Sequence, residues 1–333
     1  MNTSSGEFPV ASILITAFNR RDFIIKSVQS VLNQTIDRMN YEIIVSKNFK
    51  DEQIDLFLLE NGCINLFDPV EGIGHRLVSL ISIARSDILI FLEDDDLFYE
   101  SKVEEIFKIF TDQEISFINN NYDRIDKSGN LIQFKNRREK TIKIEEHKDL
   151  SKKFIDLYGK KEYFGMSNIS IRKKKFIPYT KLLESVNVSP DLFFFIVLNK
   201  VNGKIIFYNK ILTLYRIHVS LSNIKGDYSQ FLERRQVFWT QVREDVNNYF
   251  KLLDKDEDSE AIRLLEMLEY ESTIHLYLTS DCNLYKLHFS DVVKGGKILM
   301  KTWRIFYLKL LLMAIICYIS PKLSRKLYYY VLK

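Results

Sequence analysis

The first part of the chain alternates short apolar runs with longer segments in which apolar residues recur every three or four positions. Short apolar runs of this kind predict buried strands, and the periodic segments predict helices. Strands that alternate with helices at this spacing predict a mostly parallel sheet with right-handed crossovers. The expected strands are Val10–Ala17, Tyr41–Ser46, Ile64–Phe67 and Ile88–Leu92, and the expected helices are Asp22–Gln34, Asp51–Glu60, Gly72–Ala84 and Ser101–Phe110, the last with a capping box at Ser101 and Glu104.

The pattern changes after residue 115 and becomes almost wholly helical after residue 227. We therefore expect an α/β domain over residues 1–226 and an all-helical region over residues 227–333. In the first, the expected elements are strands at 115–119, 166–172, 204–208 and 211–215, a hairpin at 125–134, a helix at 145–158 and a helix that Ser189 caps and that runs from Pro190 to about Asn202. In the second, helices are expected at 230–253, 259–279 and 292–319, with a short one after Pro321.

Four consecutive acids, Glu93 to Asp96, follow the apolar run Ile88–Leu92. Their carboxylates repel one another, and burying them unpaired would cost several kcal/mol. Mg²⁺ or Mn²⁺ takes one or two carboxylates and leaves its other positions to the phosphate oxygens of a substrate. Ligands of open α/β sheets also bind at the carboxyl ends of strands. The acid run thus predicts a metal site, and a solvated acidic turn before the next helix is the alternative.

The cysteines and the N-terminal sequence indicate in which cellular compartment the protein is expected. The cysteines Cys63, Cys282 and Cys317 are far apart and odd in number, and no CxxC or Cys/His spacing occurs. Neither a disulfide framework nor a zinc site is indicated, and a reducing compartment fits. The N-terminus shows no charged segment followed by an apolar one, so we expect no signal peptide and a cytoplasmic location.

The C-terminal end is basic and apolar. The net charge of the chain is +4, but residues 292–333 hold nine basic residues and no acidic ones, which leaves about −5 on the rest. A spanning helix needs about 20 mostly apolar residues, whereas Trp303–Ile319 is interrupted by Arg304 and Lys309. A helix at the cytoplasmic face of a membrane, flanked by bases and by Tyr328–Tyr330, fits better. The alternatives are a helix packed on the α/β domain, a homo-oligomer interface and a short true span. We expect no nucleic acid partner, because the bases alternate with large aliphatic residues.

Seven motifs follow one another along the chain. They are TAFNR at 16–20, SVQSVLNQT at 27–35, YEIIV at 41–45, the glycine-rich helix start at 72–74, FLEDDD at 91–96, SPD at 189–191 and YRIH at 215–218. In this order they resemble the motifs of family 2 glycosyltransferases of the GT-A fold, and the resemblance covers roughly residues 8–223. The resemblance implies an inverting, metal-dependent transfer of a sugar from a nucleotide-sugar donor to a hydroxyl acceptor. The acceptor is expected to be a glycan or a lipid-linked molecule, and the membrane-facing tail would suit the second.

The resemblance also implies roles for individual residues. Asp191 corresponds to the general base that takes the proton of the acceptor hydroxyl; without the resemblance, an acid in a first helical turn would be read as stabilising the helix dipole. The nucleotide sugar is expected to contact Thr16, Phe18, Asn19, Asn48, Asp94 and Arg216. The Mn²⁺ or Mg²⁺ ion is expected at Asp95, Glu93 and His218. A structural role is the alternative for His218, and pairing with a surface acid is the alternative for Arg216.

Two departures from the family pattern keep other functions open. Glu93 stands where the family usually has aspartate, and Ser46-Lys47-Asn48-Phe49 lacks the acid that contacts the nucleobase in relatives. A nucleotidyltransferase would also use strand-end acids and a metal, with Arg20-Arg21 as its phosphate-gripping loop. A non-catalytic membrane adaptor would keep the fold without the chemistry.

Overall fold

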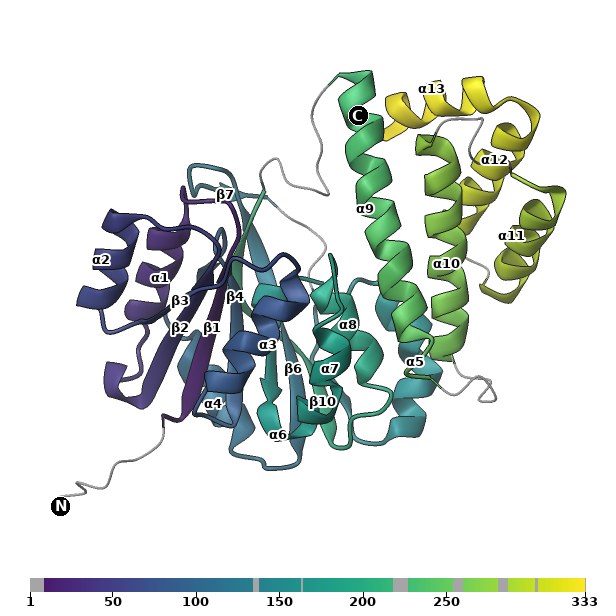
Figure 1. Cartoon of the computed structure of the whole chain (residues 1–333). Coiled ribbons are helices and arrows are strands. Elements are labelled where there is room, and N and C mark those ends of the chain that lie inside the picture. The colour runs from purple at the N-terminus through teal and green to yellow at the C-terminus, as the bar shows by residue number, and fades with distance from the viewer. Residues whose placement is uncertain are drawn as a thin grey trace, which may run out of the picture. The chain divides into compact units, whose positions relative to one another are not determined.

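A computed structural model describes residues 9–133, 138–162, 164–217, 227–253, 260–280, 287–302 and 305–332. The chain forms two compact units, residues 1–217 and residues 218–333. Figure 1 shows a sheet with flanking helices in the first unit and helices alone in the second. The α/β class predicted for the N-terminal part is confirmed.

The sheet of the first unit begins with four parallel strands in the order β3-β2-β1-β4. These strands are β1 (Ala11–Ala17), β2 (Tyr41–Lys47), β3 (Ile64–Phe67) and β4 (Ile88–Glu93). The order continues β9-β6-β10-β5, in which β9 is antiparallel to both of its neighbours and β6 and β10 are parallel. The remaining strands are β5 (Leu97–Phe98), β6 (Ile115–Ile125), β7 (Leu131–Ile132), β8 (Ile142–Ile144), β9 (Ile169–Arg172) and β10 (Lys204–Arg216).

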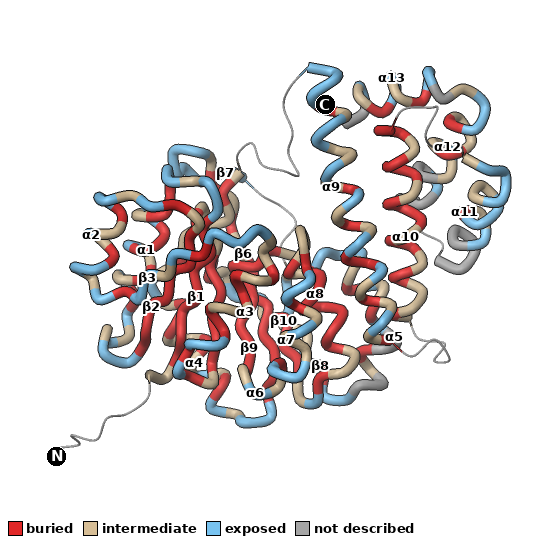
Figure 2. Tube along the Cα trace, viewed as in Figure 1, coloured by how far each residue is buried: buried red, intermediate tan, exposed pale blue. Residues whose placement is uncertain are grey.

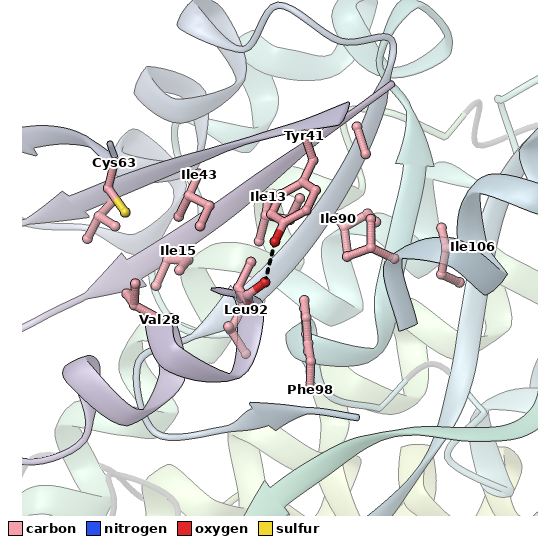
Figure 3. Packing of buried hydrophobic residues seen from close by; sticks show 14 of the residues in the cluster. Ile13, Ile15, Val28, Tyr41, Ile43, Cys63, Ile90, Leu92, Phe98 and Ile106 are labelled. Carbon is pink, nitrogen blue, oxygen red and sulfur yellow. Dashed lines mark hydrogen bonds between the residues drawn. The ribbon is translucent and has the colours of Figure 1, made fainter. Parts of the chain in front are cut away.

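Helices cover both faces of this sheet, which is why β1, β2 and β4 are buried along almost their whole length (Figure 2). On one face, Ile13, Ile43 and Ile90 pack with Val28 of α1 and Ile106 of α4 (Figure 3). On the other, α3 contacts β1 and β2, and α8 packs on β4. The helices of this unit are α1 (Ile24–Leu32), α2 (Glu52–Glu60), α3 (Ile73–Ile83), α4 (Lys102–Phe110), α5 (His147–Gly159), α6 (Lys173–Phe176), α7 (Thr180–Leu183) and α8 (Pro190–Val197).

Several predicted elements of the first unit differ in detail. The strand expected from Met166 begins as a 3-10 turn, Met166–Asn168, because Gly165 enters it with φ +86°. The two strands expected near 204–208 and 211–215 are one strand, β10. Its register against β6 shifts between Tyr208 and Ile211, where the polar residues lie. Neither Ser101 nor Ser189 caps its helix with its side chain, and α8 ends at Val197, five residues before the predicted end.

The second unit consists of helices in its described part. They are α9 (Tyr228–Tyr249), α10 (Glu260–Thr279), α11 (Phe289–Thr302), α12 (Ile305–Ile319) and α13 (Pro321–Leu332). α10 contacts each of the other four and is buried on most sides. Its His275 stacks on Trp239 of α9 at 3.9 Å and shares a hydrogen bond of 2.8 Å with the hydroxyl of Tyr328 in α13. The single helix expected over 292–319 is in fact the contacting pair α11 and α12.

No described helix combines the length and the apolar character that a membrane crossing requires. The division predicted at residue 226 stays a prediction, as does a membrane-associating role for residues 292–333.

Candidate functional site

The four acids lie where β4 ends at the carboxyl edge of the sheet, and a tight turn holds them there. The backbone N–H of Asp94 donates to the carbonyl of Thr16 on β1 at 3.2 Å, and that of Asp96 donates to the carbonyl of Glu93 at 3.2 Å. The hydroxyl of Ser27, buried in α1, lies 2.7 Å from the carbonyls of both Asp94 and Asp96. Helix α1 therefore fixes the backbone from which the carboxylates project.

Arg20 binds two of these acids. Its guanidinium donates through Nε and Nη2 to both carboxylate oxygens of Asp94, and its Nη1 lies 2.9 Å from Oδ2 of Asp95. Burial raises the pKa of Asp94 to about 6 although Arg20 opposes the shift. Sequence reasoning considered Arg20 only as part of a phosphate-gripping loop. The pairing follows from the position of Arg20 just after β1, because β1 lies next to β4, the strand that carries the acids.

The other acids experience strong mutual repulsion. Burial raises the pKa of Glu93 well above its usual range, and Asp95, Asp96 and Asp191 raise it further. Burial, followed by the charge of Asp95, raises the pKa of Asp96 to about 8. A cation placed among these carboxylates would relieve the repulsion, so the electrostatics of the site favour a bound cation.

Few side chains at this site could hold a metal ion. In the described part of the chain, no three His, Cys, Asp or Glu side chains are grouped so that they could hold one. Mg²⁺ does not need such a cage, because it is usually held by one or two carboxylates with substrate phosphates and water. Glu93 and Asp95 fit that requirement, and Asp95 remains partly open to solvent, with 14% of its side chain exposed. The predicted ligand His218 lies outside the described residues, so its role stays a prediction.

Asp191 belongs to the same site. It stands in the first turn of α8, and its Oδ2 accepts a hydrogen bond of 3.1 Å from the backbone N–H of Gly165. Burial raises its pKa, while the N–H groups of Gly165 and Leu192 oppose the shift. The charge of Asp191 also raises the pKa of Glu93, which places the two carboxyl groups within electrostatic range of each other.

Three partly exposed aromatic rings that sequence reasoning missed line the same region. Tyr122 of β6, Phe164 and Tyr215 of β10 contact one another, with ring centroids 5.2 to 5.8 Å apart. Burial raises the pKa of Tyr215, and Glu93 is the next largest cause, so this ring lies beside the acids. The motif at 215–218 contained Tyr215, but only the structure supplies its two partners.

Asn19 and Asn48 meet at the ends of β1 and β2. The N–H of Asn19 donates to Oδ1 of Asn48, and Nδ2 of Asn48 donates to Oδ1 of Asn19, both at 2.8 Å. Asn19 adopts φ +57°, a left-handed conformation that asparagine tolerates better than most residues. The neighbouring Phe18 is 40% exposed, whereas the side chain of Thr16 is buried. The structure thus brings together four of the residues predicted to contact the nucleotide sugar: Thr16, Phe18, Asn19 and Asn48.

Two buried cations near this pair were not singled out from the sequence. Lys47 turns inward, donates to the carbonyl of Phe49 at 2.7 Å and pairs with Asp55 at 2.6 Å. The guanidinium of Arg76 in α3 lies 4.3 Å from the centre of the Phe18 ring and donates to the carbonyl of Val70. Across the described residues, no carboxylate lies within ion-pair distance of Arg76. Asp68 and Glu71 act on Arg76 only from a longer distance. A buried guanidinium that makes no direct ion pair is a candidate for binding an anionic ligand.

Arg216 links the acids to the neighbouring hairpin. Its N–H donates to Asp96 at 2.9 Å, its Nε donates to the carbonyl of Asp95 at 2.7 Å, and its Nη1 donates to the carbonyls of Asp126 and Lys127. The side chain is buried and lies over the ring of Phe23. Most of its donors are therefore used within the protein, and its contact with a nucleotide sugar stays a prediction.

Comparisons with known proteins agree with this arrangement. Residues 12–177 match the model of the glycosyl transferase family 2. An uncharacterized glycosyltransferase of Rickettsia bellii is 31% identical over 127 residues, which cover 37% of this chain and 18% of the relative. The poly(ribitol-phosphate) β-N-acetylglucosaminyltransferase TarP of Staphylococcus aureus is 24% identical over 102 residues, 29% of this chain and 31% of TarP. The matched stretch thus spans less than a third of either relative.

The fold is shared with the S. aureus protein TarS. The crystal structure of TarS 1–349 in complex with UDP-GlcNAc aligns with a TM-score of 0.54 at 12% identity and covers 96% of this chain and 91% of that one. The structure of the longer TarS chain aligns with a TM-score of 0.53 and covers 95% of this chain and 55% of that one. At this identity the likeness concerns the fold alone. The match over residues 12–177 shows that this part of the chain belongs to the glycosyl transferase family 2, and the likeness to TarS shows that its fold is GT-A.

Proposed function

We propose that the protein transfers a sugar from a nucleotide-sugar donor to a hydroxyl group of an acceptor, with inversion at the anomeric carbon. The observation that carries the proposal is the convergence of Asp191 with the acids of β4. A carboxylate that can take a proton and a group of acids that can share a cation with a diphosphate lie at one edge of one sheet.

The donor is best supported as a uridine nucleotide sugar such as UDP-GlcNAc. TarS binds UDP and UDP-GlcNAc, and TarP is an N-acetylglucosaminyltransferase, which makes this donor class the first to test. In the protein itself, the paired amides of Asn19 and Asn48 retain N–H groups that could donate to a base edge. Asn48 belongs to the segment after β2 that lacks the acid found in relatives. Arg76 offers the nearby unpaired cation for a phosphate.

The proposed chemistry uses Asp191 as general base. The acceptor hydroxyl gives its proton to the Asp191 carboxylate, its oxygen forms a bond to the anomeric carbon, and the bond from that carbon to the diphosphate oxygen breaks. The N–H of Gly165 holds the carboxylate in place, and the rings of Tyr122, Phe164 and Tyr215 supply an apolar wall beside it.

A divalent cation is part of the proposal. Asp95 and Glu93 would hold it, with His218 as a further predicted ligand, and when bound it would neutralise charge on the departing diphosphate. Arg20 already pairs with Asp94 and Asp95, so it orients these carboxylates and limits their repulsion. This engagement with acids also leaves Arg20 less suited to the phosphate-gripping role that a nucleotidyltransferase would require.

A glycan or a lipid-linked molecule at the cytoplasmic face of a membrane is the proposed class of acceptor. The support is the basic, apolar end of the chain, which carries no acid after residue 291.

Calorimetry with UDP and UDP-GlcNAc, with and without Mn²⁺, tests the donor site. The proteins are the wild type, Asp95→Asn and the control Asp156→Asn, which removes an acid of α5 that is 56% exposed and forms an ion pair with Lys160. We expect Mn²⁺-dependent binding that is weakened in Asp95→Asn and unchanged in the control. If neither ligand binds in the presence of Mn²⁺, while the protein is folded, the proposed donor is wrong and the adaptor alternative gains support.

A further inference from the structure

We propose that the exposed face of α12 and α13 docks on an anionic lipid bilayer. This face, called here the α12–α13 face, consists of large apolar side chains that are between 36% and 76% exposed: Leu308, Leu312, Ile319, Leu323, Leu327 and Tyr330. Monomeric soluble proteins rarely expose many large apolar groups in one place, and such patches mark sites of protein or membrane contact.

The spacing of these residues places them on one side of each helix. Leu308, Leu312 and Ile319 follow one another at intervals of four and seven, which in an α-helix form a single stripe. Ala314 and Cys317 lie between them in sequence but are buried, so α12 has one packed side and one exposed apolar side.

Helix α13 repeats the arrangement. Leu323, Leu327 and Tyr330 are separated by four and three residues and are exposed, whereas Ser324 and Tyr328 are buried. Tyr328 is held by its hydrogen bond with His275, which fixes the rotation of α13 against α10. Figure 2 shows buried and exposed positions mixed along both helices. The fold of this unit therefore leaves the apolar stripe uncovered.

The charges beside the stripe select the kind of partner. Lys322 and Lys326 are exposed, lie one turn apart and directly precede Leu323 and Leu327 in sequence. No acidic residue occurs anywhere in residues 292–333. Lysine can lay its aliphatic stem along an apolar surface while its ammonium group reaches phosphate headgroups. Each such base near an anionic leaflet adds to the attraction.

The same features argue against other occupants. A two-fold contact between copies of this face would bury Lys322 and Lys326 in an interface to which residues 292–333 of neither copy contribute an acid. A nucleic acid would bind the lysines through its phosphates, which are contacted mainly by polar and basic groups, and it would leave the neighbouring leucines exposed. An anionic membrane surface satisfies the apolar and the basic residues together.

The test is flotation of the full-length protein with vesicles of phosphatidylglycerol and phosphatidylcholine in equal parts, and with vesicles of phosphatidylcholine alone. Two double variants probe the face: Lys322→Glu with Lys326→Glu for charge, and Leu312→Gln with Ile319→Gln for apolar contact. The matched control, Lys153→Glu with Lys181→Glu, makes the same charge change at exposed lysines of the first unit.

We expect the wild type to bind the anionic vesicles, and each face variant to bind them at least about tenfold more weakly, whereas the control variant keeps most of the affinity. Binding should fall as salt is raised. The inference is overturned if the wild type does not float with anionic vesicles, or if the control loses as much as the face variants. It is also overturned if Leu312→Gln with Ile319→Gln lowers the molecular mass in sedimentation, since that result would assign the face to a second copy. Flotation is measured without nucleotide and does not depend on donor binding. A failure of the membrane proposal can therefore be distinguished from a failure of the proposed donor site.

Discussion

Replacing Asp191 by asparagine removes the proposed general base with a small change of shape. The carboxylate accepts hydrogen bonds from the N–H groups of Gly165 and Leu192, one on each oxygen. Asparagine has only one carbonyl oxygen, so one N–H would face an NH₂ group instead of an acceptor. The lost hydrogen bond costs about 1–3 kcal/mol of the free energy of unfolding, and the relief of repulsion with Glu93 offsets part of it.

The catalytic effect should be larger than the effect on stability. A positioned general base contributes about 10²–10⁴-fold to the rate, which corresponds to roughly 3–5 kcal/mol of barrier height. We therefore expect Asp191→Asn to slow catalysis by at least about a hundredfold. Its affinity for UDP should stay close to that of the wild type, because Asp191 is assigned to the acceptor side of the reaction.

Hydrolysis of UDP-GlcNAc provides the assay, because water can replace an unidentified acceptor and still must give up a proton. UDP release is measured for the wild type, Asp191→Asn and the control Ser189→Ala, whose side chain does not cap α8. Burial raises the pKa of Asp191 above the usual aspartate range, and the base must be ionised, so the wild-type rate should fall on acidification through that raised pKa. If Asp191→Asn hydrolyses the donor within tenfold of the wild type while binding UDP equally well, the assignment of the base is refuted.

Three further outcomes follow from single contacts. A Cβ at Gly295 would overlap the buried ring of Tyr270, whereas a Cβ at Gly296 meets no atom within 4 Å. In urea titrations, Gly295→Ala should therefore lower the free energy of unfolding by about 1–3 kcal/mol, whereas Gly296→Ala should raise it by at most about 1 kcal/mol. Equal effects of the two variants would contradict the packing of α10 on α11. Burial favours a higher pKa for Glu42, but hydrogen bonds from Ser12 and Arg85 lower it overall. Glu42→Gln should cost about 2 kcal/mol at neutral pH, and the difference from the wild type should shrink as the pH falls through the lowered pKa; a cost independent of pH would exclude the carboxylate as its source. Arg76→Met should weaken UDP binding about tenfold or more in calorimetry, whereas Arg76→Lys should recover part of it; unchanged affinity in Arg76→Met would remove Arg76 from the phosphate site.

The strands at the centre of the sheet could be predicted because the pattern that produces them lies within a few neighbouring residues. β1, β2 and β4 are continuous apolar runs, and a strand covered by helices on both faces requires that pattern wherever it lies in the sheet. The acid run was visible for a similar reason, since Glu93–Asp96 follows β4 directly and the carboxyl end of a parallel strand is where ligands bind. The order of motifs added the family, which the comparisons confirm for residues 12–177.

Strand order and the partners of charged side chains depended on the tertiary structure. β9 lies between β4 and β6 although the chain reaches it much later. Its four residues, Ile-Ser-Ile-Arg, do not specify which strands it joins or in which direction. The sequence likewise does not reveal that Lys47 turns inward to Asp55.

The candidate site shows the same division. Asp191 and Glu93 are almost a hundred residues apart, and only the crossing of the chain brings their charges within range of each other. Arg20 could have served a phosphate, but the structure places its guanidinium on Asp94 and Asp95. Burial and periodicity act over a few neighbouring residues, so the buried segments and the residue types that end the central strands can be predicted from the sequence. Which charges meet depends on how distant segments cross at the edge of the sheet, so it could be learned only from the folded protein.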